Sequence, residues 1–361
     1  MPDMTVRNLF SRLVALAILG AAANLHAAGK SPVWTDPKAK DIPADFAWQG
    51  EYAGDNIGVQ VIALGGGAFH AVVCPGGLPG AGWDGENRSL MAGSMADGAV
   101  TLSAAEGPRR YNAREPEKFS AARTFPPKGH QPHWARIDAP AGATSARMTL
   151  SWEGGRVIEL AKVVRQSPTL GAKPPKGAIV LFDGSNKDAF EGGRLDAKSK
   201  LLNTDGNDIR TKRKFNNYTL HIEFMLPFRP EARGQGRGNS GFYQVDHYEV
   251  QVLDSFALEG LNNECGGVYT KANPLVNMCM PPLTWQTYDV TFRNAVATNG
   301  EKTANAVMTL KHNGVIVHDN LVIDGKTGGS RKDPEGTPGP IKLQGHGNPL
   351  QYRNIWVLEE E

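Results

Sequence analysis

The sequence has little net charge, and its C-terminal half lacks any long run of helical periodicity. Its 361 residues include 39 Lys and Arg against 37 Asp and Glu, which leaves a formal net charge of +2. No basic run or stripe supplies the charge that neutralises phosphates, so we expect no nucleic-acid partner. In residues 178–361, no run longer than two turns shows the 3.6-residue period of an amphipathic helix, and no tandem repeat of fixed period is present in the chain.

Glycine and proline are abundant instead. The 42 glycines and 24 prolines make up 66 of 361 residues, about 18%, where an average chain has about 12%. Helices accommodate both residues poorly. Because 40% of the residues are hydrophobic, the chain can still bury a core. This composition predicts an all-β fold that is rich in turns.

The longest apolar stretch lies near the start of the chain. It runs over 11 residues from Leu13 to Ala23, whereas a membrane span needs about 20. Arg7 and Arg12 precede it and the small residues Ala27 and Ala28 follow, which is typical of a secretory signal peptide. We expect residues 1–28 to be removed and the protein to be periplasmic or secreted, without a membrane span. The alternative is a buried N-terminal helix.

The chain has only three cysteines, Cys74, Cys265 and Cys279. Export permits disulfides. A bond between Cys265 and Cys279 would close a loop of about 15 residues and contribute about 3 kcal/mol in the chain-entropy model. We predict this disulfide over a zinc site, for which neither a CxxC motif nor a nearby histidine pair is present. Cys74 ends an apolar run and is predicted to be a buried thiol.

A segment rich in proline, glycine and lysine, residues 166–177 (QSPTLGAKPPKG), is typical of a linker. It divides residues 29–165 from residues 178–361. In the first part, Gly58–Leu64 and Ala68–Val73 flank three glycines and predict a β-hairpin within a small all-β domain. No motif there indicates a function.

The second part alternates short apolar runs with turn signals such as Asn299-Gly300 and Asn313-Gly314. It predicts an antiparallel, concanavalin-like β-sandwich or jelly roll. The expected strands are 178–182, 218–226, 241–245, 248–253, 287–292, 306–312, 339–344 and 353–358.

Strand alternation places long polar side chains opposite apolar ones on three of these strands. The polar members are His221, Glu223, Glu249, Gln251, Lys342, Gln344 and His346. Together with aromatic residues such as Tyr243, they suit a sugar, which needs hydrogen bonds at its hydroxyls and stacking at its face. The alternative is an ordinary solvated face.

Two carboxylates, Glu249 and Asp254, are five residues apart, so a regular strand would place them on opposite faces. A bulge at Val252-Leu253 would bring both to one face. The string resembles the E-x-D-x-x-E strand of lectin-like glycoside hydrolases, with Gln251 replacing the middle acid and Asp254 the last.

Residues 178–361 resemble the 3-keto-disaccharide hydrolase domain family, a group of concanavalin-like β-sandwiches. The matching stretches, in order, are LFDG (181–184), RGNSGFY (237–243), YEVQVLDS (248–255), GGVY (266–269), PPLTWQTYDVTF (281–292), HNGVIVHDN (312–320), LQGHGNP (343–349) and YRNIW (352–356). The chain departs from the common pattern at Gly345, where members often have Asp, and at Tyr352, where many have Phe. The first part resembles an N-terminal β domain that accompanies this family.

The resemblance implies cleavage of glycosides already oxidised at C3 of the sugar. The ketone acidifies the C2 proton, a base removes it, and the C1 substituent is eliminated, with or without addition of water. The substrate would be a glycoside or oligosaccharide, and an oxidoreductase would have to supply the 3-keto sugar. Two alternatives remain: a non-catalytic carbohydrate-binding module, and a glycosidase that uses Glu249 and Asp254 directly.

For this reaction we predict Glu249, Asp254 and His346 as catalytic residues. His346 or Asp254 would be the base at C2, and Glu249 the acid or orienting group. The predicted substrate-binding residues are Arg237, Asn239, Tyr243, Gln251, Lys271, Gln344, Arg353 and Glu223. Among them, Gln251 and Gln344 would bind hydroxyls, and Arg353 or Lys271 would stabilise the enolate oxygen. Ser240 would help Asn239 to shape the rim. We expect no required cofactor; a divalent metal such as calcium is the alternative.

Overall fold

The computed structural model describes residues 31–105, 132–138 and 146–360. The predicted signal peptide lies outside these residues. Residues 32–361 form one compact unit. In the described stretches, no helix has both the length and the apolar character needed to cross a membrane.

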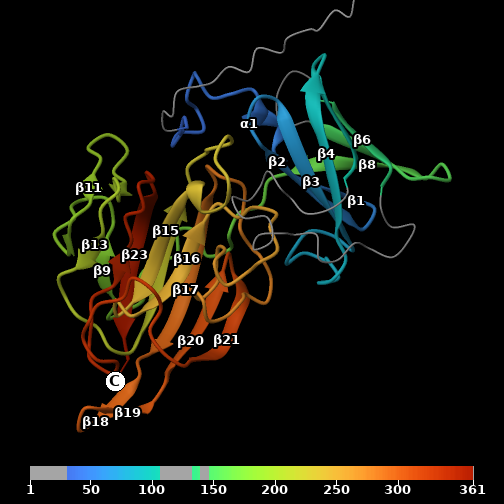
Figure 1. The fold of residues 1–361 in the computed structure, drawn as a ribbon. Helices are drawn as coiled ribbons and strands as arrows, with labels where there is room; N and C mark the ends of the chain where they lie inside the picture. Colours follow the sequence, from blue (N-terminus) through green and yellow to red (C-terminus); the bar gives the residue numbers. More distant parts are fainter. Residues whose placement is uncertain (1–30, 106–131, 139–145, 361) are drawn as a thin grey trace, which may run out of the picture. The chain divides into compact units, whose positions relative to one another are not determined.

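Eight strands of the described chain close into an antiparallel barrel (Figure 1). They are β1 (Gly50–Gly54), β2 (Ile57–Ala63), β3 (Ala68–Pro75), β4 (Ser89–Ala96), β5 (Ala99–Ala104), β6 (Trp134–Asp138), β7 (Arg147–Ser151) and β8 (Val157–Val163). A short helix, α1 (Asp45–Trp48), precedes them. The barrel closes because β1 pairs with both β2 and β8. Alternate side chains such as Val59, Val61, Ala71 and Met148 fill its interior.

The predicted hairpin is confirmed as β2 and β3. The three glycines at its turn, Gly65, Gly66 and Gly67, all have positive φ, which residues with a Cβ rarely adopt. Cys74 on β3 is buried, as predicted.

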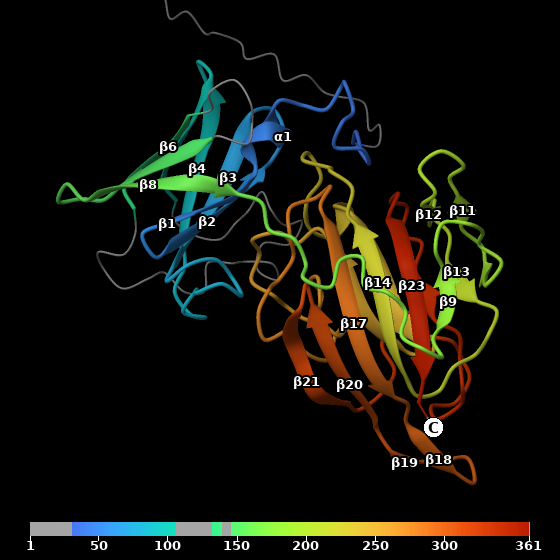
Figure 2. The ribbon, with the colours of Figure 1, turned by 180° about the vertical axis from the view of Figure 1, so that it is seen from behind.

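Two further antiparallel sheets form the second β domain (Figure 2). The five-stranded sheet contains, in spatial order, β10 (Phe190–Glu191), β13 (Ile209–Thr211), β22 (Lys342–Leu343), β15 (Asn239–Gln244) and β16 (Tyr248–Leu253). The eight-stranded sheet contains β11 (Arg194–Leu195), β12 (Leu202–Asn203), β23 (Gln351–Glu359), β14 (Tyr218–Met225), β17 (Trp285–Arg293), β20 (Ala306–His312) and β21 (Val315–Ile323), with β9 (Ile179–Phe182) beside β23. A separate hairpin pairs β18 (Val296–Thr298) with β19 (Glu301–Ala304).

The two sheets enclose one hydrophobic core. Phe242 and Val250 of the five-stranded sheet belong to the same buried cluster as Phe224 and Tyr288 of the eight-stranded sheet. The Phe242 and Tyr288 rings are 6.1 Å apart between centroids. The predicted all-β sandwich is therefore correct. The predicted strand 339–344 is reduced to the two residues of β22.

The segment 166–177, predicted as a linker, lies against the eight-stranded sheet, which it crosses in Figure 2. Thr169 donates to Asp289 at 2.7 Å, and the Gly171 amide donates to Glu223 at 2.6 Å. The Asn354 amide donates to the carbonyl of Ala172 at 3.0 Å. We call residues 166–177 the strap from here on.

Candidate functional site

The neighbouring strands β15 and β16 build the base of a polar pocket. Tyr243 stands opposite Glu249 in their register, and Gly241 stands opposite Gln251. A Cβ at Gly241 would lie 2.2 Å from Glu249 Oε1, so only glycine leaves room for this carboxylate. The glycine diagonally across from Glu249 thus leaves the space that its side chain occupies.

The pocket has a volume of about 300 Å³, at the lower end of the roughly 300–1,000 Å³ typical of small-ligand sites. Amides, hydroxyls and one carboxylate line it. Its residues are Gln235, Asn239, Tyr243, Glu249, Gln251, Tyr269, Gly328, Gly329, Gln344 and His346.

Glu249 is only 3% exposed. Burial raises the pKa of its carboxyl to about 7, although the Tyr243 hydroxyl and the nearby Lys342 ammonium favour the charged form. A carboxyl with this pKa is ionised in a large fraction of molecules near neutral pH and is still basic enough to take up a proton. It is therefore suited to acid–base chemistry.

The Tyr243 hydroxyl lies 2.8 Å from Glu249 Oε2 and also 2.8 Å from the Gly328 carbonyl oxygen. The hydroxyl has one proton for these two acceptors. It can therefore donate to an ionised Glu249, or turn to Gly328 when Glu249 carries the proton. The hydroxyl therefore keeps a hydrogen bond to the carboxyl in both protonation states: it donates to the carboxylate, and its oxygen can accept from the protonated acid.

Lys342 lies behind the pocket and is 1% exposed. Its ammonium group donates to the Gly329 carbonyl at 2.6 Å and lies 2.7 Å from an Asp246 carboxylate oxygen. It also stands 3.6 Å from the centroid of the Tyr243 ring. Lys342 thus holds both the rim glycine and the tyrosine that contacts Glu249.

Amide side chains form the opposite wall. Asn239 and Gln251 both donate to Gln235 Oε1 at 3.0 Å. Asn239 Oδ1 is buried and has no hydrogen-bond partner among the described residues. Gln344 donates to the Tyr243 hydroxyl at 3.3 Å. This wall presents neutral donors and acceptors, which match sugar hydroxyls.

The structure brings six of the predicted residues together in this pocket. These are Glu249, His346, Asn239, Tyr243, Gln251 and Gln344. His346 is exposed at the rim, whereas the others are buried or partly buried.

The proposed pairing of Glu249 with Asp254 is wrong. The register of β15 and β16 runs without a shift, so the predicted bulge is absent from this pair. Asp254 follows the strand and accepts a hydrogen bond from Arg237 at 2.8 Å, and both side chains are buried. The ion pair through Arg237 Nε neutralises the carboxylate, whereas Arg237 Nη1 and Nη2 are buried with no hydrogen-bond partner among the described residues. Neither residue lines the pocket.

The prediction that Glu223, His221 and Arg353 lie beside Glu249 is also wrong, because their strands β14 and β23 belong to the eight-stranded sheet. There Arg353 donates to Glu223 at 2.6 Å. Lys271 is exposed and pairs with Asp324 at 3.0 Å, so it does not reach the pocket either. Strand alternation identifies the face of a residue but not the sheet that carries its strand.

Ser240 was expected at the rim but points between the sheets. It donates to the Gln344 carbonyl at 2.7 Å and accepts from the Tyr352 hydroxyl at 2.8 Å. Its neighbour Asn239 faces the pocket, as the alternation of side chains requires.

Sequence reasoning missed four lining residues: Gln235, Tyr269, Gly328 and Gly329. Tyr269 lies in the quoted motif GGVY (266–269), and Gln235 lies in the glycine-rich stretch RGQGRG (233–238) just before Asn239. Gly329 has positive φ, and a Cβ there would meet the Tyr243 hydroxyl at 2.7 Å. In the sequence, only the adjacent glycines Gly328 and Gly329 could have indicated this part of the pocket rim.

The predicted disulfide between Cys265 and Cys279 is wrong, since both are free, buried thiols. The two thiols are hydrogen-bonded to each other. In addition, Cys265 Sγ lies 3.1 Å from the Tyr288 hydroxyl, and Cys279 Sγ lies 3.5 Å from the Leu253 carbonyl oxygen. Burial raises the pKa of the Cys279 thiol.

A metal centre would need several converging ligands. In the part of the chain that the structure describes, no group of three or more His, Cys, Asp or Glu side chains is arranged to hold a metal ion. Glu249 and His346 are the two such residues that line the pocket.

The structure explains why Gly345 stands where members of the similar family often have aspartate. A Cβ at this position would lie 2.3 Å from backbone atoms of Asn207. The Gly345 amide also donates to Asp208 at 3.0 Å. The local backbone therefore leaves no room for an aspartate side chain here.

The fold and pocket define an antiparallel β-sandwich with a polar, acid-containing site on its five-stranded sheet. Residues 177–358, half of the chain, match the family model described as the 3-keto-alpha-glucoside-1,2-lyase-like domain. The chain therefore belongs to this family, as its motifs predict.

Three of the solved structures with similar chains come from Parabacteroides distasonis, and each of these is described as a "putative glycosyl hydrolase". One shares 34% identity, covering 52% of this chain and 85% of its own, with a TM-score of 0.48. A second shares 16% identity over 51% of this chain and 95% of its own, with a TM-score of 0.38. No protein of curated function matches the chain.

Proposed function

We propose that the pocket on β15 and β16 cleaves 3-keto-glycosides. A base removes the C2 proton, the C3 ketone takes the electron pair as an enolate, and the C1–O bond breaks by elimination. Water can then add to the enone, giving net hydrolysis. Family membership supports the substrate class. The observation that carries the proposal is the buried Glu249 carboxyl, whose pKa is raised to about 7, among neutral hydrogen-bonding groups.

Glu249 is the proposed base, which revises the roles expected from sequence. Asp254 is neutralised by Arg237 and lies outside the pocket. Glu249 faces the pocket, and its proton affinity suits removal of an acidified C–H at near-neutral pH. After proton transfer the Tyr243 hydroxyl can donate to the Gly328 carbonyl. Its oxygen can then accept a hydrogen bond from the protonated Glu249 carboxyl.

The enolate oxygen needs a donor. Gln344 uses one of its two amide hydrogens on Tyr243, and no described residue accepts the second. We assign Gln344 to this oxygen, and the Gln251 and Asn239 amides to sugar hydroxyls. His346 stands at the rim and is assigned to protonate the leaving oxygen.

The protein should be incubated with a disaccharide and with the same disaccharide oxidised at C3, and the products measured. Release from the oxidised sugar alone is the expected result. Release from the native sugar would support a direct glycosidase, and binding without release would support a carbohydrate-binding module. Either outcome contradicts the proposal.

Glu249→Gln tests the assigned base with little change in shape. We expect turnover of the 3-keto-glycoside to fall by at least about 100-fold, the typical contribution of a positioned acid or base. Glu191→Gln, at an exposed position outside the pocket, is the matched control and should retain full activity. Full activity in a folded Glu249→Gln protein would remove Glu249 from the mechanism.

Two further proposals concern where the protein is located and how its substrate is produced. We propose that it is exported to the periplasm or secreted. We also propose that it receives its substrate from an oxidoreductase that converts the C3 hydroxyl of a glycoside to a ketone.

A further inference from the structure

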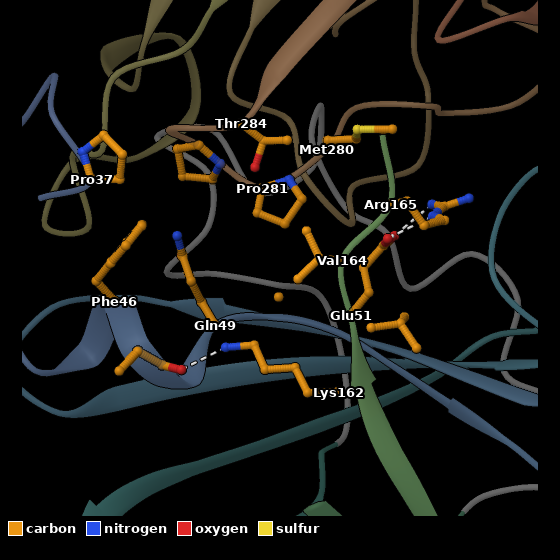
Figure 3. Close-up of a pocket in the computed structure, with 14 residues that line it drawn as sticks. Pro37, Phe46, Gln49, Glu51, Lys162, Val164, Arg165, Met280, Pro281 and Thr284 are labelled. Atoms are coloured by element: carbon orange, nitrogen blue, oxygen red, sulfur yellow. Dashed lines mark hydrogen bonds and ion pairs between the residues drawn. The ribbon is translucent and has the colours of Figure 1, made fainter. Parts of the chain in front are cut away.

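A second cavity, of about 360 Å³, has mostly apolar walls. They come from three stretches of the compact unit, residues 37–51, 162–165 and 280–284. Phe46, Val164, Met280 and Pro281 contribute apolar surface to it (Figure 3). Two of these stretches lie outside the family match at residues 177–358. The volume falls within the range of small-molecule sites.

One polar side chain in this cavity is unpaired. Gln49 is 3% exposed, and neither its Oε1 nor its Nε2 atom has a hydrogen-bond partner among the residues that the structure describes. Figure 3 shows the side chain standing between Phe46 and Val164. A buried amide that lacks both partners is unfavourable and rare in native structures. A ligand that supplies one acceptor and one donor would satisfy both atoms.

The charged groups of the cavity are already engaged. Glu51 is bound by two nitrogens of Arg165, each at 2.6 Å, and by the Gln60 amide at 2.9 Å. Lys162 donates to the Ala47 carbonyl at 2.5 Å, and burial lowers its pKa to about 8. Among the described lining residues, therefore, no free carboxylate or guanidinium is left to bind an ionised ligand. Burial also disfavours the charged form of the Lys162 amine.

We propose that this cavity binds a neutral ring compound that carries a carboxamide or lactam group. The ring packs against Phe46, Val164 and the prolines. The ligand's carbonyl accepts from Gln49 Nε2, and its N–H donates to Gln49 Oε1. The site would give the N-terminal part of the chain a ligand-binding role that does not depend on the proposed reaction.

Benzamide is a suitable probe, because it has the ring, the amide and no charge. The full chain should be titrated with benzamide, benzoate and toluene, with affinity followed by calorimetry and by the ¹H–¹⁵N side-chain resonances of Gln49. We expect saturable benzamide binding with a dissociation constant of about 1–10 mM for so small a ligand. Benzoate and toluene should each bind at least about tenfold more weakly.

Gln49→Leu keeps the size of the side chain and removes both amide atoms. It should weaken benzamide binding about tenfold, and because the amide has no partner the variant should melt no lower than the wild type. Gln166→Leu, at an exposed position outside the cavity, is the matched control and should leave binding unchanged. If Gln49→Leu binds benzamide as the wild type does, or toluene binds as well as benzamide, the amide does not select the ligand and the proposal is wrong. Absence of benzamide binding at 50 mM, about five times the weakest expected dissociation constant, also overturns it.

Discussion

A carboxyl group buried among amides and a phenol holds its proton to a higher pH than one in water. For Glu249 this means a rise of the pKa from 4.5 to about 7. Between these pH values the folded protein binds more protons than the unfolded chain, so its stability falls as pH rises. The acid that supports the proposed reaction is thus a source of instability above neutral pH.

Replacing this acid should stabilise the protein. We expect Glu249→Gln to show a smaller loss of unfolding free energy between pH 5 and pH 8 than the wild type, by up to about 3 kcal/mol. Urea unfolding at the two pH values measures the difference. Glu191→Gln, which changes an exposed acid, should follow the wild type. Parallel pH profiles for Glu249→Gln and the wild type would show that Glu249 titrates normally.

Lys342 controls the same carboxyl from behind Tyr243. Its charge lowers the pKa of Glu249, so Lys342→Met should raise that pKa and move the acid limb of the activity profile to higher pH. The measurement is kcat/KM against pH for folded variants. Lys311→Met, at an exposed position, is the control. If the acid limb of the kcat/KM profile stays at the same pH, Lys342 does not influence the pKa of Glu249 and serves only to hold Gly329.

Gly345 provides a test of backbone packing. Gly345→Ala would place a Cβ against the Asn207 backbone, and we expect a loss of about 1–3 kcal/mol in unfolding free energy. Gly236→Ala is the matched control, because a Cβ there meets no described atom within 4 Å. Thermal or urea unfolding of both variants measures this loss. Equal stabilities would contradict the close approach of Gly345 to the Asn207 backbone.

At the scale of elements, the strap is held by a charged network that spans β14 and β17. His221 lies 2.6 Å from Asp289 and 3.5 Å from Glu223, and Trp356 stacks on its ring. Burial lowers the pKa of His221, but the hydrogen bonds to Asp289 and Glu223 outweigh it, so the pKa is raised overall. The same two acids bind the strap at Thr169 and Gly171.

This network predicts a strap that loosens at high pH. A histidine with a raised pKa contributes its full stabilisation below about 6.5, the ordinary value, and loses it as pH rises through the folded-state pKa. Hydrogen exchange at the Gly171 amide should therefore speed up across this range by more than the intrinsic base catalysis explains. In His221→Gln the excess should disappear; if it persists, another group controls the strap.

The strands themselves were largely predictable, and their assignment to sheets was not. Alternation correctly separated His221 and Glu223 from the apolar face of β14, and Glu249 and Gln251 from that of β16. Which strands share a sheet depends on hydrogen bonds between distant segments, and a local pattern does not record these. For this reason Glu223 was placed beside Glu249, although the two strands lie in different sheets.

Across the whole molecule, the all-β class and the family follow from composition and motifs, because turn residues and apolar runs act locally. The pocket needs residues that are far apart in sequence, from Gln235 to His346. Gly328, Gly329 and Tyr269 are brought beside Glu249 only when the chain folds. The motifs indicate the strand that carries Glu249, whereas the ion pair that neutralises Asp254 forms with Arg237, 17 residues away, only in the folded chain.

Export is the remaining prediction at this scale. The basic residues Arg7 and Arg12, the apolar run from Leu13 to Ala23 and the small residues that follow predict cleavage after Ala27 or Ala28. Expressed in a Gram-negative host, the full chain should reach the periplasm with Ala28 or Gly29 as its first residue, as N-terminal sequencing and intact mass would show. Because a charge in the middle of the apolar run should abolish its recognition, Ile18→Arg should leave the protein uncleaved in the cytoplasm. Lys30→Gln, beyond the cleavage site, is the control and should be exported normally. Uncleaved wild-type protein in the cytoplasm would contradict the assignment.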